Sequence, residues 1–505
     1  WSCSEGVSKD ETAISTEARF SEPHRPRYHF TPPSQWMNDP NGMVYYEGEY
    51  HLFYQHYPDS NVWGPMHWGH AMSPDLVHWE HLPIGLYPDS LGYIFSGSAV
   101  VDRNNSSGFD TAGIPPLVAI FTYHDPEGAD AGRDDFQYQA IAYSLDRGRT
   151  WTKYAGNPVV PNPGIRDFRD PKVFWHAASR QWVMIFAAKD RVRLYNSSNL
   201  KDWTYASEFG AGAGSHGGVW ECPDLFELPV EGTDHSRWVL LLSINPGGPN
   251  GGSATQYFVG DFDGQTFTLD PSQSPRDTLW LDYGRDNYAG VTWSDIPESD
   301  GRRLFIGWMS NWDYAQAVPT TAWRSAMTLP RTLSLVRIDE HYRVRSRPVQ
   351  ELDRLRKTSV EVEPMSVTGT VDLTDRIAFS PAVMEAELIF TLPASGAADV
   401  GVELSNDRGE RYRIGYDMAA NKFYSDRTRA GKTGFSEKFA AGRHFAPRFL
   451  DDRTLMLHLY LDVASAEAFF DGGSTVLTDI FFPNADFNCI RLYAEGSAEI
   501  GRAHV

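Results

Sequence analysis

A loose unit of sequence recurs five times between residues 38 and 310 of this chain. Each unit opens on a polar motif and continues as two β-branched and aromatic runs joined by a turn, which is typical of β-hairpins. The polar openings lie at residues 39, 96, 170, 221 and 286. Repeated strand units of this spacing indicate a β-propeller with four-stranded blades and variable loops. The sequence therefore predicts a five-bladed propeller.

A second element recurs late in the same units. It reads "SPDLVHW", "SLDRGRTW", "SSNLKDW" and, in a degenerate form, "GDFDGQTF". Each copy has an Asp or Asn near a turn and ends in an aromatic residue. We expect that aromatic residue to close the outer edge of its blade.

The repeat fades after residue 337, and the rest of the chain has a different pattern. Residues 338–359 are charged and suit a linker with a short helix. From residue 360 to residue 505, short alternating strands with turn signals about every 8 to 15 residues predict a β-sandwich. Residues 1–22 are polar and predict a flexible lead-in. The fold class is therefore all-β: a propeller over residues 23–337, expected to be the catalytic domain, followed by a C-terminal β-sandwich.

Composition excludes several classes of protein. The 505 residues carry a formal charge of −21, which argues against binding nucleic acid or an anionic membrane. No apolar run approaches the roughly 20 residues that a membrane-spanning helix requires. The three cysteines, Cys3, Cys222 and Cys489, have neither disulfide-framework nor metal-ligand spacing. No metal and no cofactor is expected, and Cys222 is expected to be a small buried residue, since no base pattern accompanies it.

The chain begins at Trp1 without a basic and then apolar leader. We interpret it as a mature secreted chain from which a signal peptide has been removed. Sequons at Asn104, Asn105 and Asn196 would be used only in a eukaryotic secretory pathway.

Three of the five openings carry a carboxylate: Asp39, Asp170 and Glu221. The first strand of each propeller blade lines the central channel, so these residues are expected to meet at one end of it. Two carboxylates on either side of a bond are the minimum for hydrolysis of a glycoside, because one attacks or activates water and the other protonates the leaving oxygen. A third carboxylate can stabilise a positively charged transition state.

Each carboxylate also has a structural interpretation. Asp39 lies in "WMNDPNG", whose residues are typical of a tight turn, and a rigid turn at the channel mouth would hold Asp39 still. Asp167 competes with Asp170, and Asp224 competes with Glu221, for the same roles.

Three motifs, "WMNDPNG", "RDP" and "WECPDLF", resemble in this order the signature blocks of glycoside hydrolase family 32, the β-fructofuranosidases. The likeness covers residues 26–335 closely and implies the propeller and sandwich predicted above. The segments "GGSATQYFVGDFDG" and "SNWDYA" look most like those of exo-acting inulinases and levanases, which release terminal fructose. The late segment "LDVASAEAFFDGG" lacks the Arg and the first Ser pair of the family's pattern, so no role for the sandwich is implied.

The resemblance implies a retaining mechanism without a metal or cofactor. Asp39 would be the nucleophile that forms a covalent fructosyl-enzyme, Glu221 the general acid and then base, and Asp170 the stabiliser of the transition state. The substrates would be fructans (levan or inulin) and sucrose. The residues expected to bind them are Trp36, Asn38, Gln55, Trp63, Phe95, Ser96, Arg169 and Trp312.

Other functions fit the same residues. An endo-levanase or a fructosyltransferase would use the same three carboxylates, because water and a sugar hydroxyl compete for one intermediate. A non-catalytic fructan-binding protein would not need all three acids. A five-bladed arabinan hydrolase would share the fold but not these motifs. The preference for β-2,1 or β-2,6 linkages and the oligomeric state are not fixed by these motifs.

Overall fold

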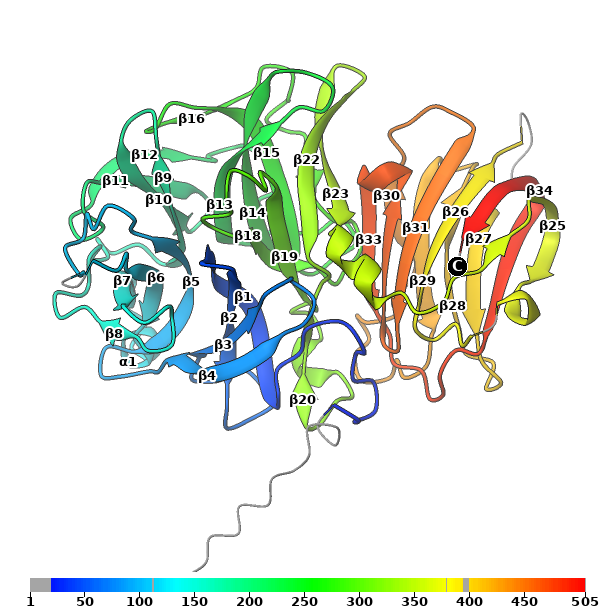
Figure 1. Cartoon of the computed structure of the whole chain (residues 1–505), viewed down its shortest axis with the longest axis horizontal. Coiled ribbons are helices and arrows are strands. Elements are labelled where there is room, and N and C mark those ends of the chain that lie inside the picture. Colours follow the sequence, from blue (N-terminus) through cyan, green and yellow to red (C-terminus); the bar gives the residue numbers. More distant parts are fainter. Residues whose placement is uncertain (1–19, 111–112, 378, 394–398, 505) are drawn as a thin grey trace, which may run out of the picture.

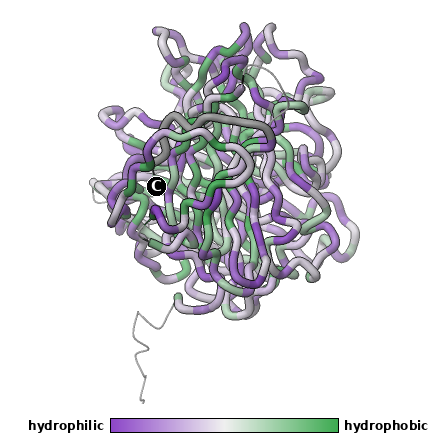
Figure 2. The backbone as a smooth tube through the Cα atoms, turned by 90° about the vertical axis from the view of Figure 1, so that its right-hand side faces the viewer, coloured by the Kyte–Doolittle hydropathy of each residue, from purple (hydrophilic) through white to green (hydrophobic). Residues whose placement is uncertain are grey.

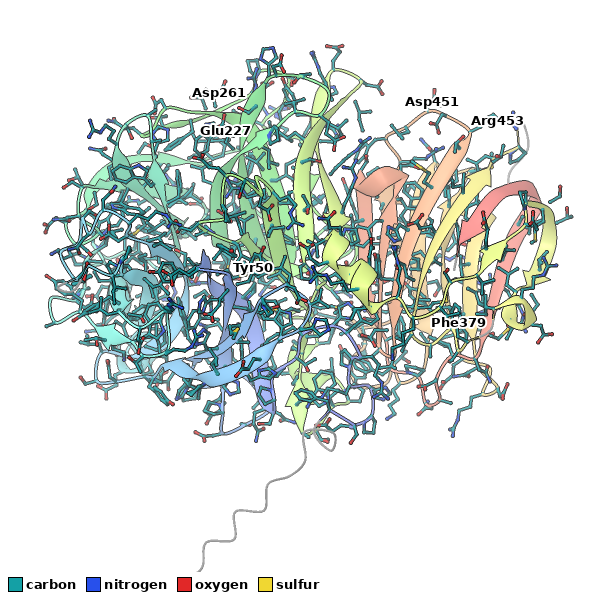
Figure 3. The ribbon with its side chains drawn as sticks, viewed as in Figure 1. Tyr50, Glu227, Asp261, Phe379, Asp451 and Arg453 are labelled. Carbon is teal, nitrogen blue, oxygen red and sulfur yellow. The ribbon has the colours of Figure 1, made fainter. Side chains whose placement is uncertain are left out.

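The computed structural model describes residues 20–110, 113–377, 379–393 and 399–504, and it consists mainly of β-strands in two domains that lie side by side (Figure 1). Most of the predicted lead-in, including Cys3, lies outside these residues. Hydrophobic stretches run through the sheets and hydrophilic stretches form the outer loops (Figure 2). Side chains fill the interior of both domains (Figure 3). No helix in the described part of the chain is long and apolar enough to cross a membrane.

The first domain contains five sheets of four or five strands. The first sheet has β1 (Gln35–Tyr46), β2 (Glu49–Tyr57), β3 (His67–Ser73), β4 (Glu80–Leu86) and β20 (Trp323–Arg324), which is parallel to β1. The second has β5 (Tyr93–Val101), β6 (Leu117–His124), β7 (Gln137–Ser144) and β8 (Thr152–Lys153), with helix α1 (Pro126–Asp130) between β6 and β7. The third has β9 (Phe168–His176), β10 (Gln181–Ala188), β11 (Val192–Ser197) and β12 (Thr204–Phe209). The fourth has β13 (Val219–Pro229), β14 (Ser236–Asn245), β15 (Ala254–Phe262), β16 (Phe267–Leu269) and β17 (Leu279–Trp280). The fifth has β18 (Tyr288–Thr292), β19 (Arg303–Met309), β21 (Ala326–Met327), β22 (Arg331–Ile338) and β23 (His341–Pro348).

The first strands of these sheets form a closed ring. β1 contacts β5, β5 contacts β9, β9 contacts β13, β13 contacts β18, and β18 returns to β1. Each sheet extends outward from its ring strand through antiparallel neighbours. The prediction of a five-bladed propeller, made from the repeated openings, is confirmed.

The second repeated element folds into one type of turn. In the second blade, Ser144 Oγ donates to Asp146 (2.7 Å) and Trp151 Nε1 donates to the carbonyl of Gly148 (3.0 Å). The same two bonds recur in the turns that join β3 to β4 and β11 to β12. The aromatic residue therefore fastens the turn before the outermost strand of these blades.

The fifth blade extends beyond the predicted boundary at residue 337. β22 and β23 pair from Arg331 to Pro348, so β23 occupies part of the predicted linker over 338–359. Its alternating arginines resemble a solvated linker in sequence, but Arg345 and Arg347 both bind Glu231 of the neighbouring blade (2.7 and 2.9 Å). The short helix η2 (Gln350–Leu355) follows and leads into the second domain.

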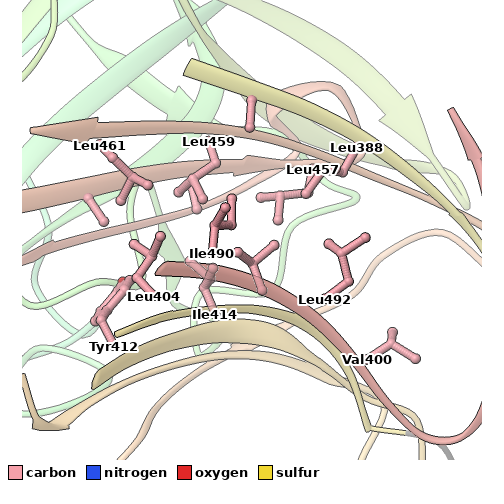
Figure 4. Packing of buried hydrophobic residues seen from close by; sticks show 14 of the residues in the cluster. Leu388, Val400, Leu404, Tyr412, Ile414, Leu457, Leu459, Leu461, Ile490 and Leu492 are labelled. Carbon is pink, nitrogen blue, oxygen red and sulfur yellow. The ribbon is translucent and has the colours of Figure 1, made fainter. Parts of the chain in front are cut away.

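The second domain is a β-sandwich. Its strands are β24 (Glu361–Val362), β25 (Met365–Asp372), β26 (Met384–Thr391), β27 (Asp399–Ser405), β28 (Arg411–Asp417), β29 (Lys422–Arg429), β30 (His444–Pro447), β31 (Thr454–Asp462), β32 (Ser465–Phe470), β33 (Thr475–Ile480) and β34 (Cys489–His504). The long strand β34 pairs first with β27 and then with β26, and so joins the two layers. Leucines of β26 and β31 face aliphatic residues of β27, β28 and β34 across the core (Figure 4).

A buried network of charges joins the domains. Arg331 of the propeller bonds to Asp282 (3.0 Å) and to Glu467 of the sandwich (2.5 Å), and all three side chains are almost fully buried. His29 bonds to Glu467 (2.9 Å) and to Asp462 (2.8 Å). Burial would lower the pKa of His29, but these two hydrogen bonds outweigh it and raise the pKa to about 9. The segment "LDVASAEAFFDGG" thus supplies the acids that join the sandwich to the propeller.

We expect Arg331→Met to lower the free energy of unfolding by about 3–5 kcal/mol, because it leaves Asp282 buried without its cation and leaves Glu467 with His29 as its remaining cationic partner. Urea denaturation followed by tryptophan fluorescence measures the change in the propeller, since every tryptophan precedes residue 324. Arg337→Met, which breaks an exposed pair with Glu340, is the control and should cost less than about 1 kcal/mol. Equal effects of the two substitutions would contradict the assignment of the network.

Candidate active site

Every ring strand is irregular at the same end of the propeller. The pairing shifts between Met37 and Pro40 of β1, Ile94 and Gly97 of β5, Arg169 and Lys172 of β9, Glu221 and Asp224 of β13, and Tyr288 and Val291 of β18. A β-bulge bends its strand and redirects a side chain. Four of these bulges contain a polar opening, at residues 39, 96, 170 and 221, and the contacts described below bring these four openings together at one mouth of the channel. The fifth opening, Asp286, precedes its bulge and binds Arg427 of the sandwich instead.

The predicted tight turn at "WMNDPNG" is wrong. These residues belong to β1, which remains paired with β2 on either side of two register shifts. Pro40 has no N–H to donate, and Gly42 has a φ of +53°, so the strand departs from a regular ladder without reversing. The chain reverses instead at Glu47 and Gly48, both at positive φ, where the hairpin was predicted. Asp39 is therefore held by a bulged strand.

Asp39 and Asp170 lie on either side of one thiol. Asp39 accepts hydrogen bonds from Ser96 Oγ (2.7 Å) and Asn38 Nδ2 (3.0 Å). Cys222 Sγ lies 3.5 Å from Asp39 Oδ2 and 3.6 Å from Asp170 Oδ2, and the Cys222 backbone N–H donates to Asp170 (3.1 Å). Cys222 is buried, as predicted, but it also connects the two carboxylates.

Arg169 faces the carboxylates from β9. Its Nη2 donates to Glu221 Oε1 (2.9 Å), its Nε lies 3.8 Å from Asp170 Oδ2, and its Nη1 donates to Asp167 (2.6 Å). The hydroxyl of Tyr288 donates to the other oxygen of Glu221. Burial and the charge of Glu221 hold the pKa of Tyr288 well above its usual value, so it stays a donor. Tyr288 was not predicted, although it follows the fifth opening by two residues.

The proximity of these acids shifts their protonation. Burial raises the pKa of Asp39, and the charge of Glu221 adds to the rise. Burial also raises the pKa of Asp170 to about 7; Arg169 opposes this rise, while Glu221 and Asp39 add to it. Carboxylates coupled in this way share protons as a unit. The cluster therefore keeps a proton at mildly acidic pH.

The two competing acids have other partners. Asp167 accepts a hydrogen bond from Arg169 Nη1. The other two nitrogens of the same guanidinium, Nε and Nη2, donate to Glu221. Asp224 is fully buried and accepts from the backbone N–H and the hydroxyl of Thr292 (2.7 and 2.8 Å). Asp224 therefore has no surface to offer a ligand, whereas the Glu221 side chain is 19% exposed.

Aromatic side chains stand beside the carboxylates. Trp63 is 37% exposed, and its ring meets Phe95 edge to face with centroids 6.1 Å apart. Trp312 is partly exposed and stacks on Trp36 at 5.9 Å. Flat apolar faces next to hydrogen-bonding groups are suited to a sugar ring.

Four of the residues expected to bind substrate are buried: Trp36, Asn38, Gln55 and Ser96. Trp36 exposes no surface, and its indole N–H donates to Asn38 Oδ1 (2.7 Å). Gln55 is almost fully buried and donates to the carbonyl of Ile94 on β5 (2.9 Å). Both act in this structure by fixing the strands that carry Asp39 and Ser96, rather than by lining the opening.

One group of residues with metal-ligand atoms, Glu385, Glu387 and His458, occurs in the described part of the sandwich. Glu385 already accepts from Arg356 (2.6 Å), Tyr460 (2.8 Å) and the ring of His458 (2.6 Å). We therefore interpret the group as an ion-pair cluster.

Family models and relatives match nearly the whole chain. The model described as "Glycosyl hydrolases family 32 N-terminal domain" matches residues 29–348, and "Glycosyl hydrolases family 32 C terminal" matches residues 351–505. A levanase of Bacillus subtilis is 51% identical over 476 residues (94% of this chain and 69% of the relative). An extracellular exo-inulinase of Aspergillus niger is 40% identical over 514 residues (95% and 93%).

Two solved structures also superpose on nearly the whole chain. The crystal structure of exo-inulinase from Aspergillus awamori superposes with a TM-score of 0.87 at 37% identity, covering 96% of this chain and 98% of that one. A β-fructofuranosidase from Schwanniomyces occidentalis, complexed with fructosyl-erythritol, has a TM-score of 0.85 at 34% identity and covers 97% and 99%.

Proposed function

The chain belongs to glycosyl hydrolase family 32, and from this we propose that it is an exo-acting, retaining β-fructofuranosidase. It releases terminal fructose units from levan or inulin, and also acts on sucrose. The observation that carries the proposal is the cluster of Asp39, Asp170 and Glu221 around Arg169 at the mouth of the propeller. The names of the relatives, levanase and exo-inulinase, support the substrate class and the exo mode.

The contacts of each acid suit a distinct role. Asp39 attacks the anomeric carbon, and the hydrogen bonds from Ser96 and Asn38 hold its carboxylate in place for the attack. Glu221, oriented by Arg169 and Tyr288, delivers a proton to the leaving oxygen as the glycosidic bond breaks.

The second half of the reaction reverses these roles. A water molecule gives a proton to Glu221 and attacks the covalent fructosyl-enzyme, which frees fructose and restores Asp39. Asp170 binds the fructose hydroxyls, and its negative charge stabilises the oxocarbenium-like transition state. No step in this scheme requires a metal or a cofactor.

The proposal includes secretion. Polymeric fructans are too large to enter a cell intact, and the matched exo-inulinases are described as extracellular. A net charge of −21 also favours solubility outside the cell.

Product analysis with levan, inulin and sucrose, each digested separately and followed by anion-exchange chromatography, tests the proposal. We expect free fructose to rise alone from the polymers, with relative rates that give the preferred linkage. Early oligosaccharides would instead indicate an endo-levanase, and elongated products a fructosyltransferase. Binding without turnover would indicate a non-catalytic fructan-binding protein.

We expect Glu221→Gln to lower kcat on fructans by roughly 10²–10⁴-fold, because the amide cannot protonate the leaving oxygen. The loss should be much smaller on an aryl fructoside whose leaving group needs no proton. Initial-rate kinetics on both substrates measure the difference. Glu208→Gln, which alters an acid on the outer strand β12, is the control. Equal losses on both substrates would assign the proton donor elsewhere.

Ser96→Ala should move the acidic limb of the kcat/KM profile to higher pH by about one unit. The hydrogen bond from Ser96 lowers the pKa of Asp39, so its loss raises that pKa. The nucleophile must be ionised, and it would then become protonated at a higher pH. Ser98→Ala is the control, since Ser98 lies on the same strand but donates to Pro171 (3.0 Å). An unchanged acidic limb in Ser96→Ala would show that Asp39 does not set it.

A further inference from the structure

The loop over residues 311–318 lies between the active site and the sandwich. On its active-site side, the ring of Trp312 packs on Trp308 (4.8 Å) and Trp36 (5.9 Å). Trp36 in turn holds Asn38, which donates to the nucleophile Asp39. A displacement of the 311–318 loop would therefore reach Asp39 through the ring contact between Trp312 and Trp36 and two hydrogen bonds.

On its other side, the same loop is bound by the sandwich through Tyr314. The Tyr314 hydroxyl donates to Asp286 Oδ1 (2.7 Å) and accepts from Arg427 Nη2 (2.7 Å). Arg427 belongs to β29, and its Nη1 donates to the second oxygen of Asp286 (2.5 Å). The ring of Phe439, also of the sandwich, meets Tyr314 edge to face at 5.0 Å.

Asp313 provides a second attachment. Its carboxylate accepts from Arg285 of the propeller (2.5 Å) and from Lys438 of the sandwich (2.7 Å). The Lys438 side chain is 67% exposed, so this pair contributes little energy. Arg427 and Asp286 have no exposed side-chain surface, so their geometry is fixed by mutual pairing. The main attachment is therefore the one through Tyr314.

We propose that the β-sandwich is a positioning element of the catalytic centre. Arg427 and the segment over residues 430–442 hold the 311–318 loop in place. The loop keeps Trp312 against Trp36 and so keeps Asn38 directed at Asp39. Tyr314 and Arg427 are positioning residues, because they act through these neighbours. The inference rests on the proposed function for its kinetic readout.

Tyr314→Phe tests the inference, because it removes only the hydroxyl and leaves the Arg427–Asp286 pair intact. We expect kcat/KM on fructans to fall on the order of 10-fold, as small misplacements of reacting groups do. The acidic limb of the profile should also move to higher pH, because the hydrogen bond from Asn38 lowers the pKa of Asp39. Lys438→Met should have a smaller effect, about twofold.

Tyr412→Phe is the matched control. Tyr412 is a fully buried sandwich tyrosine whose hydroxyl donates to Asp479 (3.2 Å) and whose ring packs on Phe481 (5.0 Å). This variant should keep the wild-type pH profile even if its melting temperature falls. If the pH profile of Tyr412→Phe shifted as much as that of Tyr314→Phe, the shift would be a consequence of general destabilisation. That result would overturn the inference.

Hydrogen exchange followed by mass spectrometry gives a readout that does not depend on activity. Amides of the 311–318 loop should exchange faster in Tyr314→Phe than in the wild type, and no faster in Tyr412→Phe. Unchanged exchange together with unchanged kinetics would overturn the inference. If the wild type releases no fructose from any substrate, the proposed function fails, and the exchange rates alone still decide whether the sandwich holds the loop.

Discussion

The repulsion among three carboxylates at one mouth of the propeller is the constraint on which the rest of this structure depends. Asp39, Asp170 and Glu221 lie within a partly desolvated opening, where like charges strongly disfavour simultaneous ionisation. Arg169 supplies the compensating cation, and the thiol of Cys222 and the hydroxyl of Tyr288 supply neutral donors. These groups come from four different ring strands, so the cluster exists only while the ring is closed. Burial and charge then keep a proton in the cluster at mildly acidic pH.

The ring accommodates the cluster by giving up regular pairing where the acids lie. Asp170 and Cys222 have φ values of +66° and +46°, which are costly for residues with side chains. The cost is confined to one or two residues per strand, because regular antiparallel pairing resumes on either side of each bulge. In a regular strand these side chains would point alternately to the two faces of the sheet. The bulges direct them to the opening instead. The backbone strain is thus located at the carboxylate cluster, and the regular pairing of the blades on either side supports it.

This balance explains which features the sequence could predict. The repeated openings and turn motifs are local signals, and they were sufficient for the propeller, its ring strands and the acids that they carry. Other features depend on partners distant in sequence. Glu467 binds Arg331, and the partners are far apart in sequence. The same is true of Tyr288 and Glu221. These pairs form only when the sheets pack together, so no local sequence pattern predicts them. The prediction of a turn at "WMNDPNG" was wrong because bulged strands and tight turns favour the same residue types. The arginines of β23 have the sequence pattern of a linker, but in the structure two of them form ion pairs with Glu231 of the neighbouring blade.

The charged interface between the domains follows from the same requirement for fixed geometry. Arg331 of the propeller binds Glu467 of the sandwich, and Arg427 of the sandwich binds Asp286 of the propeller. Buried ion pairs often add little net stability compared with apolar packing, since desolvation offsets their attraction. Directional hydrogen bonds, however, allow one relative placement of two surfaces, whereas apolar surfaces tolerate sliding. The 311–318 loop contacts both the sandwich and Trp36, which bonds to Asn38 beside Asp39, so a shift between the domains would be transmitted to Asp39. An interface that specifies placement therefore serves the active site better than one that only adds stability.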